Sequence, residues 1–166
     1  MKRSGFFDTV GTFVIDSITT WAQCALNTVL KKAGRPGGVP QQNDWFPQMI
    51  LLENAIRDFI SLPCNCILIG HDAVTKDEVS GSVSRDLMIT GKLVRRIPLL
   101  FDEIYFAINK RTPHGIEYYF ATQGTSQYQA RSRLGAGGLL DELEAPDFKA
   151  IMRKVGLSAE DMPDLM

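Results

Sequence analysis

Residues that build metal centres and disulfide frameworks are scarce in this chain, which has three cysteines and two histidines among its 166 residues. Cys64 and Cys66 lie too close in sequence for an easy disulfide. His71 and His114 do not fall in the paired spacing of a zinc site. The scarcity argues against a structural zinc site and against a disulfide framework, and we expect reduced, buried thiols.

An excess of basic charge and a long apolar run are also absent. Lys and Arg number 18 against 19 Asp and Glu, so the net charge is −1. Such a chain has no overall positive field to attract nucleic acid, although a local basic patch stays open. No apolar run has the length of a membrane-spanning helix, and Asp8 interrupts the apolar residues near the N-terminus, unlike a signal peptide. We expect one domain with a sizeable core, in the cytoplasm and without membrane contact.

A phosphate-binding loop is the third absence. Such a loop needs glycine, four residues, then Gly-Lys-Ser/Thr, so that backbone amides surround the phosphates. The only Gly-Lys pair is Gly91-Lys92, with Asp86 where the first glycine should stand and Leu93 where a hydroxyl residue should follow. Two glycine-rich stretches, 34–38 and 135–138, contain no lysine. The 166 residues therefore hold no motif of this kind.

What the sequence does contain is an alternation of apolar strands and amphipathic helices. The first half predicts a buried strand at 12–16, helices at 17–33 and 44–61, and a second buried strand at 64–70. Strands separated by helices pair in parallel, which predicts an α/β sheet with helical crossovers.

The second half predicts more strand than helix. We expect a loop or irregular hairpin over 72–91, a short helix at 91–101, strands at 103–109, 116–123 and 128–133, and a short helix around 148–155. The three strands should form an antiparallel meander on one edge of the sheet. Residues 156–166 then form a C-terminal tail.

Polar residues follow both strands of the first half. Asp16 and Ser17 end the first strand, and His71 follows the second. Ligands bind at the carboxyl ends of the strands in open α/β sheets, so these side chains predict a site there. Two plainer interpretations stay open: Asp16 caps the next helix, and His71 is a solvated loop residue.

Basic and aromatic side chains gather in the second half. Lys92, Arg95 and Arg96 form a cluster that is either a solvated face or directed at phosphates. Arg131 and Arg133 share one face of a predicted strand, where they either pair with the acidic C-terminal residues or bind phosphate. The aromatic residues at strand spacing favour cross-strand packing over a base-stacking platform; they are Tyr105, Phe106, Tyr118, Tyr119 and Phe120.

Taken in order, these segments resemble a known group of ATPases over about residues 10–155. Residues 12–19 (TFVIDSIT) resemble the Walker B strand of RecA/RadA/KaiC-like ATPases, and residues 66–71 (CILIGH) resemble their next core strand. Residues 90–105 resemble the helix–strand segment of bacteriophage AAA-type, RecA-like nucleotide-binding proteins associated with single-strand annealing, and residues 128–134 resemble their closing strand.

The resemblance implies a partial RecA-like P-loop NTPase core over 1–155, the C-terminal portion of a longer or split ATPase without its Walker A region. It also implies roles for the site residues. Asp16 would hold Mg²⁺ beside Ser17, His71 would sense the γ-phosphate, Lys92 or Arg95 would stabilise transition-state charge in trans, and Arg131 and Arg133 would bind the nucleotide.

The cofactors implied are ATP and Mg²⁺, bound weakly or not at all by this chain alone. The partners implied are further copies of the chain or a Walker A-bearing chain, together with single-stranded DNA, in the cytoplasm of a phage-infected host. The expected function is ATP hydrolysis for DNA recombination or replication, poor without the phosphate loop. The alternative is a non-catalytic assembly or DNA-associated module that keeps the fold.

Overall fold

The computed structural model describes residues 5–79 and 81–157. These residues group into two compact units. The first contains the described residues up to 73 together with 87–97, and the second contains those of 74–86 and 98–157. The described chain is a mixed α/β structure with four α-helices and several small sheets.

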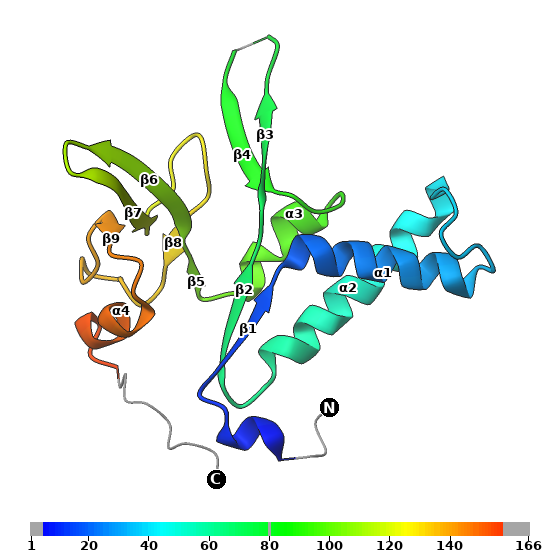
Figure 1. Cartoon of the computed structure of the whole chain (residues 1–166), viewed down its shortest axis with the longest axis horizontal. Coiled ribbons are helices and arrows are strands. Elements are labelled where there is room, and N and C mark those ends of the chain that lie inside the picture. The colour runs from blue at the N-terminus through cyan, green and yellow to red at the C-terminus, as the bar shows by residue number, and fades with distance from the viewer. Residues whose placement is uncertain (1–4, 80, 158–166) are drawn as a thin grey trace. The chain divides into compact units, whose positions relative to one another are not determined.

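The first unit begins with a strand–helix–helix–strand order (Figure 1). The elements are β1 (Thr12–Asp16), α1 (Ile18–Lys32), α2 (Trp45–Ile60) and β2 (Asn65–Ile69), with 3₁₀ turns η1 (Phe6–Thr9) and η2 (Gln42–Asp44). Strands β1 and β2 pair in parallel, with Thr12 opposite Asn65 and Asp16 opposite Ile69. The predicted parallel pairing across two helices is therefore confirmed.

Both helices cover the same face of the strand pair, to the right of it in Figure 1. The Phe13 ring of β1 lies edge-on to Phe59 of α2, with 5.7 Å between the ring centroids. Trp21 of α1 contacts the same ring at 6.3 Å. The core of this unit is formed by apolar residues of the two helices, namely Ile18, Ala22, Ala25, Leu26, Leu30, Leu52, Ile56 and Phe59.

The opposite face of the strand pair is more open than the sequence predicted. Val14 of β1 is 47% exposed and Ile69 of β2 is 42% exposed, so the prediction of two buried strands was wrong for this face. Alternate residues of a strand point to opposite faces, and the two helices cover only the residues on one side. The apolar run indicated a strand correctly but not its degree of burial.

The cysteines also differ from the prediction of buried thiols, since Cys24 on α1 is exposed. Cys66 on β2 is half-buried, and its Sγ lies 3.2 Å from the Phe59 carbonyl oxygen, to which it donates. Burial, followed by the neighbouring Cys64, raises the pKa of the Cys66 thiol to about 11. All three cysteines are free.

A hairpin and a short helical segment follow β2. Strands β3 (Asp72–Lys76) and β4 (Val83–Leu87) form the hairpin, one of the two structures predicted for this stretch. The predicted helix at 91–101 is reduced to α3 (Leu93–Arg96) and the 3₁₀ turn η3 (Pro98–Leu100). Pro98 lacks an amide hydrogen, which interrupts the helical hydrogen bonds.

The second unit is built on short antiparallel pairings. Its elements after η3 are β5 (Glu103–Ile104), β6 (Phe106–Thr112), β7 (Gly115–Ala121), β8 (Arg131–Ser132), β9 (Leu143–Glu144) and α4 (Phe148–Lys154). Strands β6 and β7 form a seven-pair hairpin, as predicted. The Tyr105 ring stacks on Phe120, and the Phe106 ring stacks on Tyr128.

Two features of the predicted meander were wrong. In the described residues the meander is not on the edge of the β1–β2 sheet, because β6, β7 and β9 form a sheet of their own. The third strand of that sheet is β9, which pairs with β7 at Phe120 and Ala121. The segment predicted for that position supplies only β8, which pairs with β5 instead. The predicted tail lies mostly outside the described residues.

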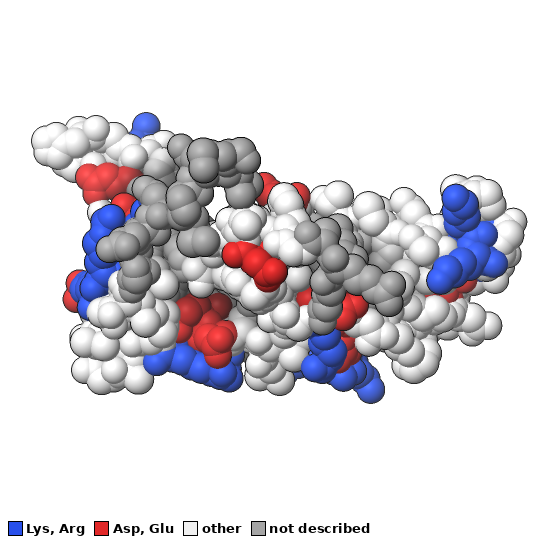
Figure 2. Space-filling model, turned by 90° about the horizontal axis from the view of Figure 1, so that it is seen from below, with Lys and Arg blue, Asp and Glu red and all other residues white. Residues whose placement is uncertain are grey.

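Charge is distributed without a dominant sign. On the face of the molecule shown in Figure 2, basic and acidic side chains lie next to one another, with no broad area of either kind. No helix in the described residues has both the length and the apolar character needed to span a membrane.

Among the described glycines of the first unit, Gly70 has the least space for a side chain, and it gives the first prediction. A Cβ there would lie 2.2 Å from Leu87 Cδ1 and 3.0 Å from Ile18 Cγ2. We expect Gly70→Ala to lower the free energy of unfolding by about 1–3 kcal/mol in chemical denaturation, because the added methyl group overpacks this contact. In the double variant with Gly70→Ala and Leu87→Ala, the loss of unfolding free energy should be at least about 1 kcal/mol smaller than the sum of the two single losses. Additive costs would show that Leu87 does not limit the space at Gly70.

Candidate site at the carboxyl ends of the parallel strands

The parallel pair brings the predicted polar residues to one end of the sheet. Asp16 is the last residue of β1 and lies opposite Ile69, two residues before His71. Both strands run in the same direction, so Asp16 and His71 both lie at the carboxyl end. The sequence predicted this placement, and the register confirms it.

Ser17 connects the two strand ends. Its side chain is the N-cap of α1, where Oγ accepts a hydrogen bond from the Thr20 amide at 3.3 Å. The same oxygen lies 3.4 Å from Nδ1 of His71, and the His71 amide donates to Thr19 Oγ1 at 3.3 Å. Two hydrogen bonds, Ser17–His71 and Thr19–His71, therefore link the first turn of α1 to the residue that follows the end of β2 by two positions. Ser17 is 3% exposed, so its two contacts are partly shielded from water, whereas His71 is exposed and its bond to Thr19 is open to solvent.

Asp16 has a different environment from Ser17, although the two are adjacent. It is exposed, on the same face of β1 as Val14, and no described residue hydrogen-bonds to its carboxylate. The peptide bond between Asp16 and Ser17 is cis. The plainer interpretation for Asp16 was a helix cap, but Ser17 fills that position. The Asp16 carboxylate is thus free to bind a ligand.

A metal at Asp16 would receive few protein ligands. The described residues contain no group of three or more His, Cys, Asp or Glu side chains able to hold a metal ion. Mg²⁺ tolerates this, because it keeps several waters and often binds through one or two carboxylates together with substrate phosphates. The donor set fits Mg²⁺ delivered with a nucleotide and does not fit zinc or calcium, which require more protein ligands.

The basic cluster is divided by the structure. Nη2 of Arg96 donates to Oε1 of Glu53 at 2.9 Å, and Arg57 binds the same oxygen at 2.8 Å. Lys92 and Arg95 are exposed and have no ion pair with a described residue. Of the apolar residues in the same segment, Leu93 and Ile97 are buried, whereas Leu100 is half-buried. Arg96 therefore joins α3 to α2, which leaves Lys92 and Arg95 as the free cations of the cluster.

Chain connectivity keeps Lys92 near the strand ends. The Met88 amide donates to the His71 carbonyl oxygen at 2.8 Å. Four residues then lead from Met88 to Lys92, so their α-carbons lie within about 14 Å of one another. A lysine side chain at that position can reach toward a ligand at the carboxyl ends of β1 and β2.

Arg131 and Arg133 belong to the second unit, where both already have partners. Nη2 of Arg131 donates to the carbonyl oxygens of Pro98 and Phe101 at 3.0 and 2.8 Å. Nη1 of Arg133 pairs with Asp102 at 2.7 Å, not with the acidic C-terminal residues suggested by the sequence. These bonds hold β8 against the segment before β5. Binding of the two arginines to a nucleotide stays a prediction.

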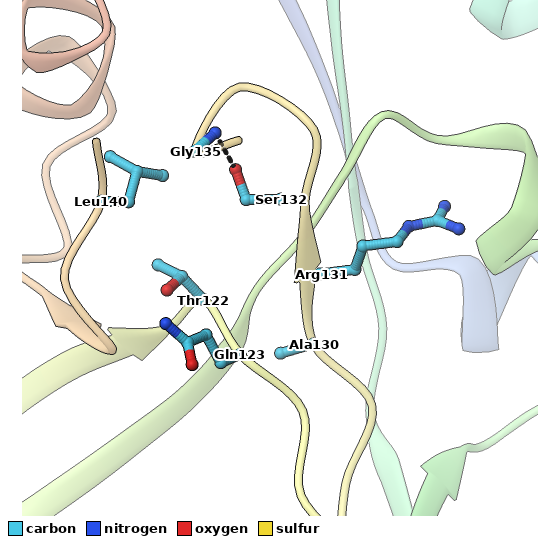
Figure 3. A pocket seen from close by; sticks show the side chains of 7 residues that line it. All are labelled: Thr122, Gln123, Ala130, Arg131, Ser132, Gly135 and Leu140. Atoms are coloured by element: carbon cyan, nitrogen blue, oxygen red, sulfur yellow. Dashed lines mark hydrogen bonds between the residues drawn. The ribbon is translucent and has the colours of Figure 1, made fainter. Parts of the chain in front are cut away.

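A small hollow of about 210 Å³ also lies in the second unit (Figure 3). Thr122, Gln123, Ser132 and Leu140 line it, whereas the Arg131 side chain extends away from it. Thr122 Oγ1 donates to the Asp141 carbonyl, and Ser132 Oγ accepts from the Gly135 amide. Its volume is below the range typical of ligand pockets, and its hydroxyl groups are already hydrogen-bonded. The hollow is a packing feature.

Two contributors to the first site escaped the sequence analysis. They are Thr19 and Thr20. Thr19 Oγ1 accepts a hydrogen bond from the His71 amide, and the Thr20 amide donates one to Ser17 Oγ. A hydroxyl-rich first helical turn after a strand was the available signal. Glu53, which engages Arg96, gave no signal because it is 43 residues away in sequence.

Comparisons with protein-family models, with curated proteins and with solved structures each gave no match.

Ser17 supplies the second prediction. We expect Ser17→Ala to lower the free energy of unfolding by about 1 kcal/mol, because the first turn of α1 loses its cap. It should also shift the nuclear magnetic resonance signals of the His71 ring nitrogens, because Nδ1 loses its nearby hydroxyl. Ser126→Ala, at an exposed loop serine, is the matched control and should change neither measurement. An unchanged His71 signal in Ser17→Ala would show that the 3.4 Å contact is not formed in solution.

Proposed function

We propose that this chain is the Walker B and sensor portion of a phage RecA-like ATPase that acts in DNA recombination or replication. The phosphate loop would come from another segment or from a partner chain. The observation that carries the proposal is the free Asp16 carboxylate at the carboxyl end of a parallel strand, with His71 held at the same end through Ser17. Fold analogy gives the class of ATPase, and the resemblance of the sequence segments gives the link to DNA.

The residues have separate tasks in this proposal. Asp16 would hold a Mg²⁺ ion delivered with a nucleotide, and the ion would neutralise phosphate charge. His71 donates or accepts a hydrogen bond near the γ-phosphate, with its ring oriented by Ser17. Lys92 and Arg95, unpaired in the described structure, offer positive charge to a phosphate of a neighbouring nucleotide.

In this proposal, a segment that carries the phosphate loop would pair with an outer edge of the β1–β2 sheet. The described β1–β2 sheet has two strands only, so each strand has one outer edge whose backbone groups lack a strand partner. An added strand can pair with such an edge and extend the sheet. The sheet formed by β1 and β2 can therefore still gain a strand from another segment at either outer edge.

Weak nucleotide binding by this chain alone gives the third prediction. Without phosphate-cradling amides, we expect a Kd for Mg²⁺–ATP no tighter than about 1 mM, or about −4 kcal/mol. At millimolar Mn²⁺–ATP, paramagnetic broadening should be strongest for the amide signals of Asp16, Ser17 and His71. Asp16→Asn should remove that broadening because it removes the carboxylate that binds the ion.

Asp58→Asn is the matched control, because Asp58 is an exposed carboxylate on α2. In this variant, the amide signals of Asp16, Ser17 and His71 should broaden as they do in the unaltered chain. The proposed site would be contradicted if the amide signal of residue 16 broadened equally in the Asp16→Asn variant and in the unaltered chain. Broadening centred on another region would also contradict it. Micromolar affinity in calorimetry would contradict the expected weakness.

A non-catalytic assembly or DNA-associated module is the alternative. The observation that favours it is the small donor set: one free carboxylate, one histidine and two exposed cations are present, without a phosphate loop. If Mn²⁺–ATP caused no paramagnetic broadening of the amide signals of Asp16 or His71, the result would favour this alternative.

A further inference from the structure

The β6–β7 hairpin exposes an aromatic ring that the sequence analysis assigned to packing. Tyr118 is 63% exposed, and Ile116 on the same strand is 59% exposed. Their cross-strand partners are Asn109, opposite Tyr118, and Arg111, opposite Ile116. Directly opposed residues of an antiparallel pair share a face, so these four exposed side chains form one surface, which we call the Tyr118 face.

Negative charge lies on the other face of the hairpin. Glu117 accepts hydrogen bonds from the Tyr119 hydroxyl and from Thr112 Oγ1. The ammonium group of Lys110, opposite Glu117, lies 5.7 Å from the centroid of the Tyr119 ring. The acidic residue of the hairpin is thus held away from the Tyr118 face.

Glu144 is a carboxylate on the Tyr118 side of the sheet, but it lies farther along the strand and is paired with a lysine. Glu144 lies opposite Phe120, and its Oε1 is 2.6 Å from the ammonium group of Lys154. Its side chain is 11% exposed. Arg111 has no carboxylate partner in the described residues, so the Tyr118 face combines a free guanidinium, an amide and an accessible ring.

We propose that the Tyr118 face binds single-stranded DNA, with a base stacked on the Tyr118 ring and a neighbouring phosphate paired with Arg111. Every base offers a π-face to an aromatic side chain, and a guanidinium matches a phosphate in geometry and charge. The Asn109–Tyr118 and Arg111–Ile116 pairs are successive on this face, so the α-carbons of Tyr118 and Arg111 lie about 7–8 Å apart along the diagonal of the sheet. A base and a phosphate of adjacent nucleotides can span that separation.

The same features favour a single strand over a duplex. Bases in a duplex are stacked on each other and leave no face for the Tyr118 ring. Duplex binding depends on many phosphate contacts, but the chain has a net charge of −1 and Figure 2 shows no broad basic area on the face in view. Ile116 favours deoxyribose over ribose, because its methyl groups would desolvate a 2′-hydroxyl without offering a partner.

This inference extends the proposed function, because it names the surface that contacts DNA. The Tyr118 face lies in the second unit, whereas the Asp16 site lies in the first. Binding to DNA is measured without nucleotide, so the two proposals can fail separately. Asp16→Asn should bind DNA as the unaltered chain does.

The test is fluorescence anisotropy of labelled oligo(dT) with the full 166-residue chain at low salt. We expect Tyr118→Ala to weaken binding about tenfold, and Tyr118→Phe to stay within about twofold because it keeps the ring. Arg111→Ala should weaken binding several-fold and reduce the slope of log affinity against log salt by about 0.7, the value for one phosphate contact on a single strand. Lys110→Ala is the matched control, because it removes a charge from the neighbouring residue on the opposite face.

Several outcomes would overturn the proposal. They are no binding of oligo(dT) by the unaltered chain, unchanged binding by Tyr118→Ala, or equal losses in Lys110→Ala and Arg111→Ala. Oligo(U) or duplex DNA binding as tightly as oligo(dT) would overturn the choice of single-stranded DNA. Thermal unfolding followed by circular dichroism shows that each variant is folded, which we expect because all three side chains are exposed. Photo-crosslinking of bromodeoxyuridine-substituted DNA should label the peptide that contains Tyr118, and a label elsewhere would contradict the surface.

Discussion

The absence of a side chain at Gly70 is the constraint on which the first unit depends. It lets the end of β2 approach Ile18 at the start of α1 and Leu87 at the end of β4. Three segments far apart in sequence therefore meet at one point. The hydrogen bonds of His71 follow from this approach: its amide binds Thr19, its ring lies beside Ser17, and its carbonyl accepts from Met88. The geometry of the candidate site is thus a consequence of backbone packing.

Two adjacent residues divide the polar chemistry at this point. Ser17 is buried and uses its hydroxyl within the protein, so it supports the fold and orients its neighbour. Asp16 is exposed and has no described partner, so its charge is available to a ligand. The same division recurs in the basic segment, where Arg96 is bound to Glu53 while Lys92 and Arg95 face solvent. In both places, a side chain that is hydrogen-bonded within the protein is a close neighbour in sequence of an exposed charged side chain without a described partner.

Sequence patterns were sufficient where local physics decides the outcome. Helical spacing and a capping serine defined α1, and two apolar runs ended by Asp16 and His71 defined the parallel pair and its polar edge. Long-range choices were not predictable. Nothing local indicates that residues 131–132 pair with β5 while Leu143–Glu144 joins β7, because each pairing has only two residues and depends on the surrounding packing. The exposure of Tyr118 was missed for the same reason: alternation shows that a strand has two faces but not which of them is covered.

The exposed thiol of Cys24 has a practical consequence for any study of self-association. Cys66 is shielded and protonated at ordinary pH, but Cys24 lies on the solvent side of α1. During storage in air, two copies of the chain can become joined by a covalent bond between their Cys24 sulfurs. Such a species has the mass of a dimer and disappears with a reductant such as dithiothreitol. Assembly state is therefore best measured on reduced protein or on a Cys24→Ser variant, in which a remaining dimer reflects noncovalent contacts alone.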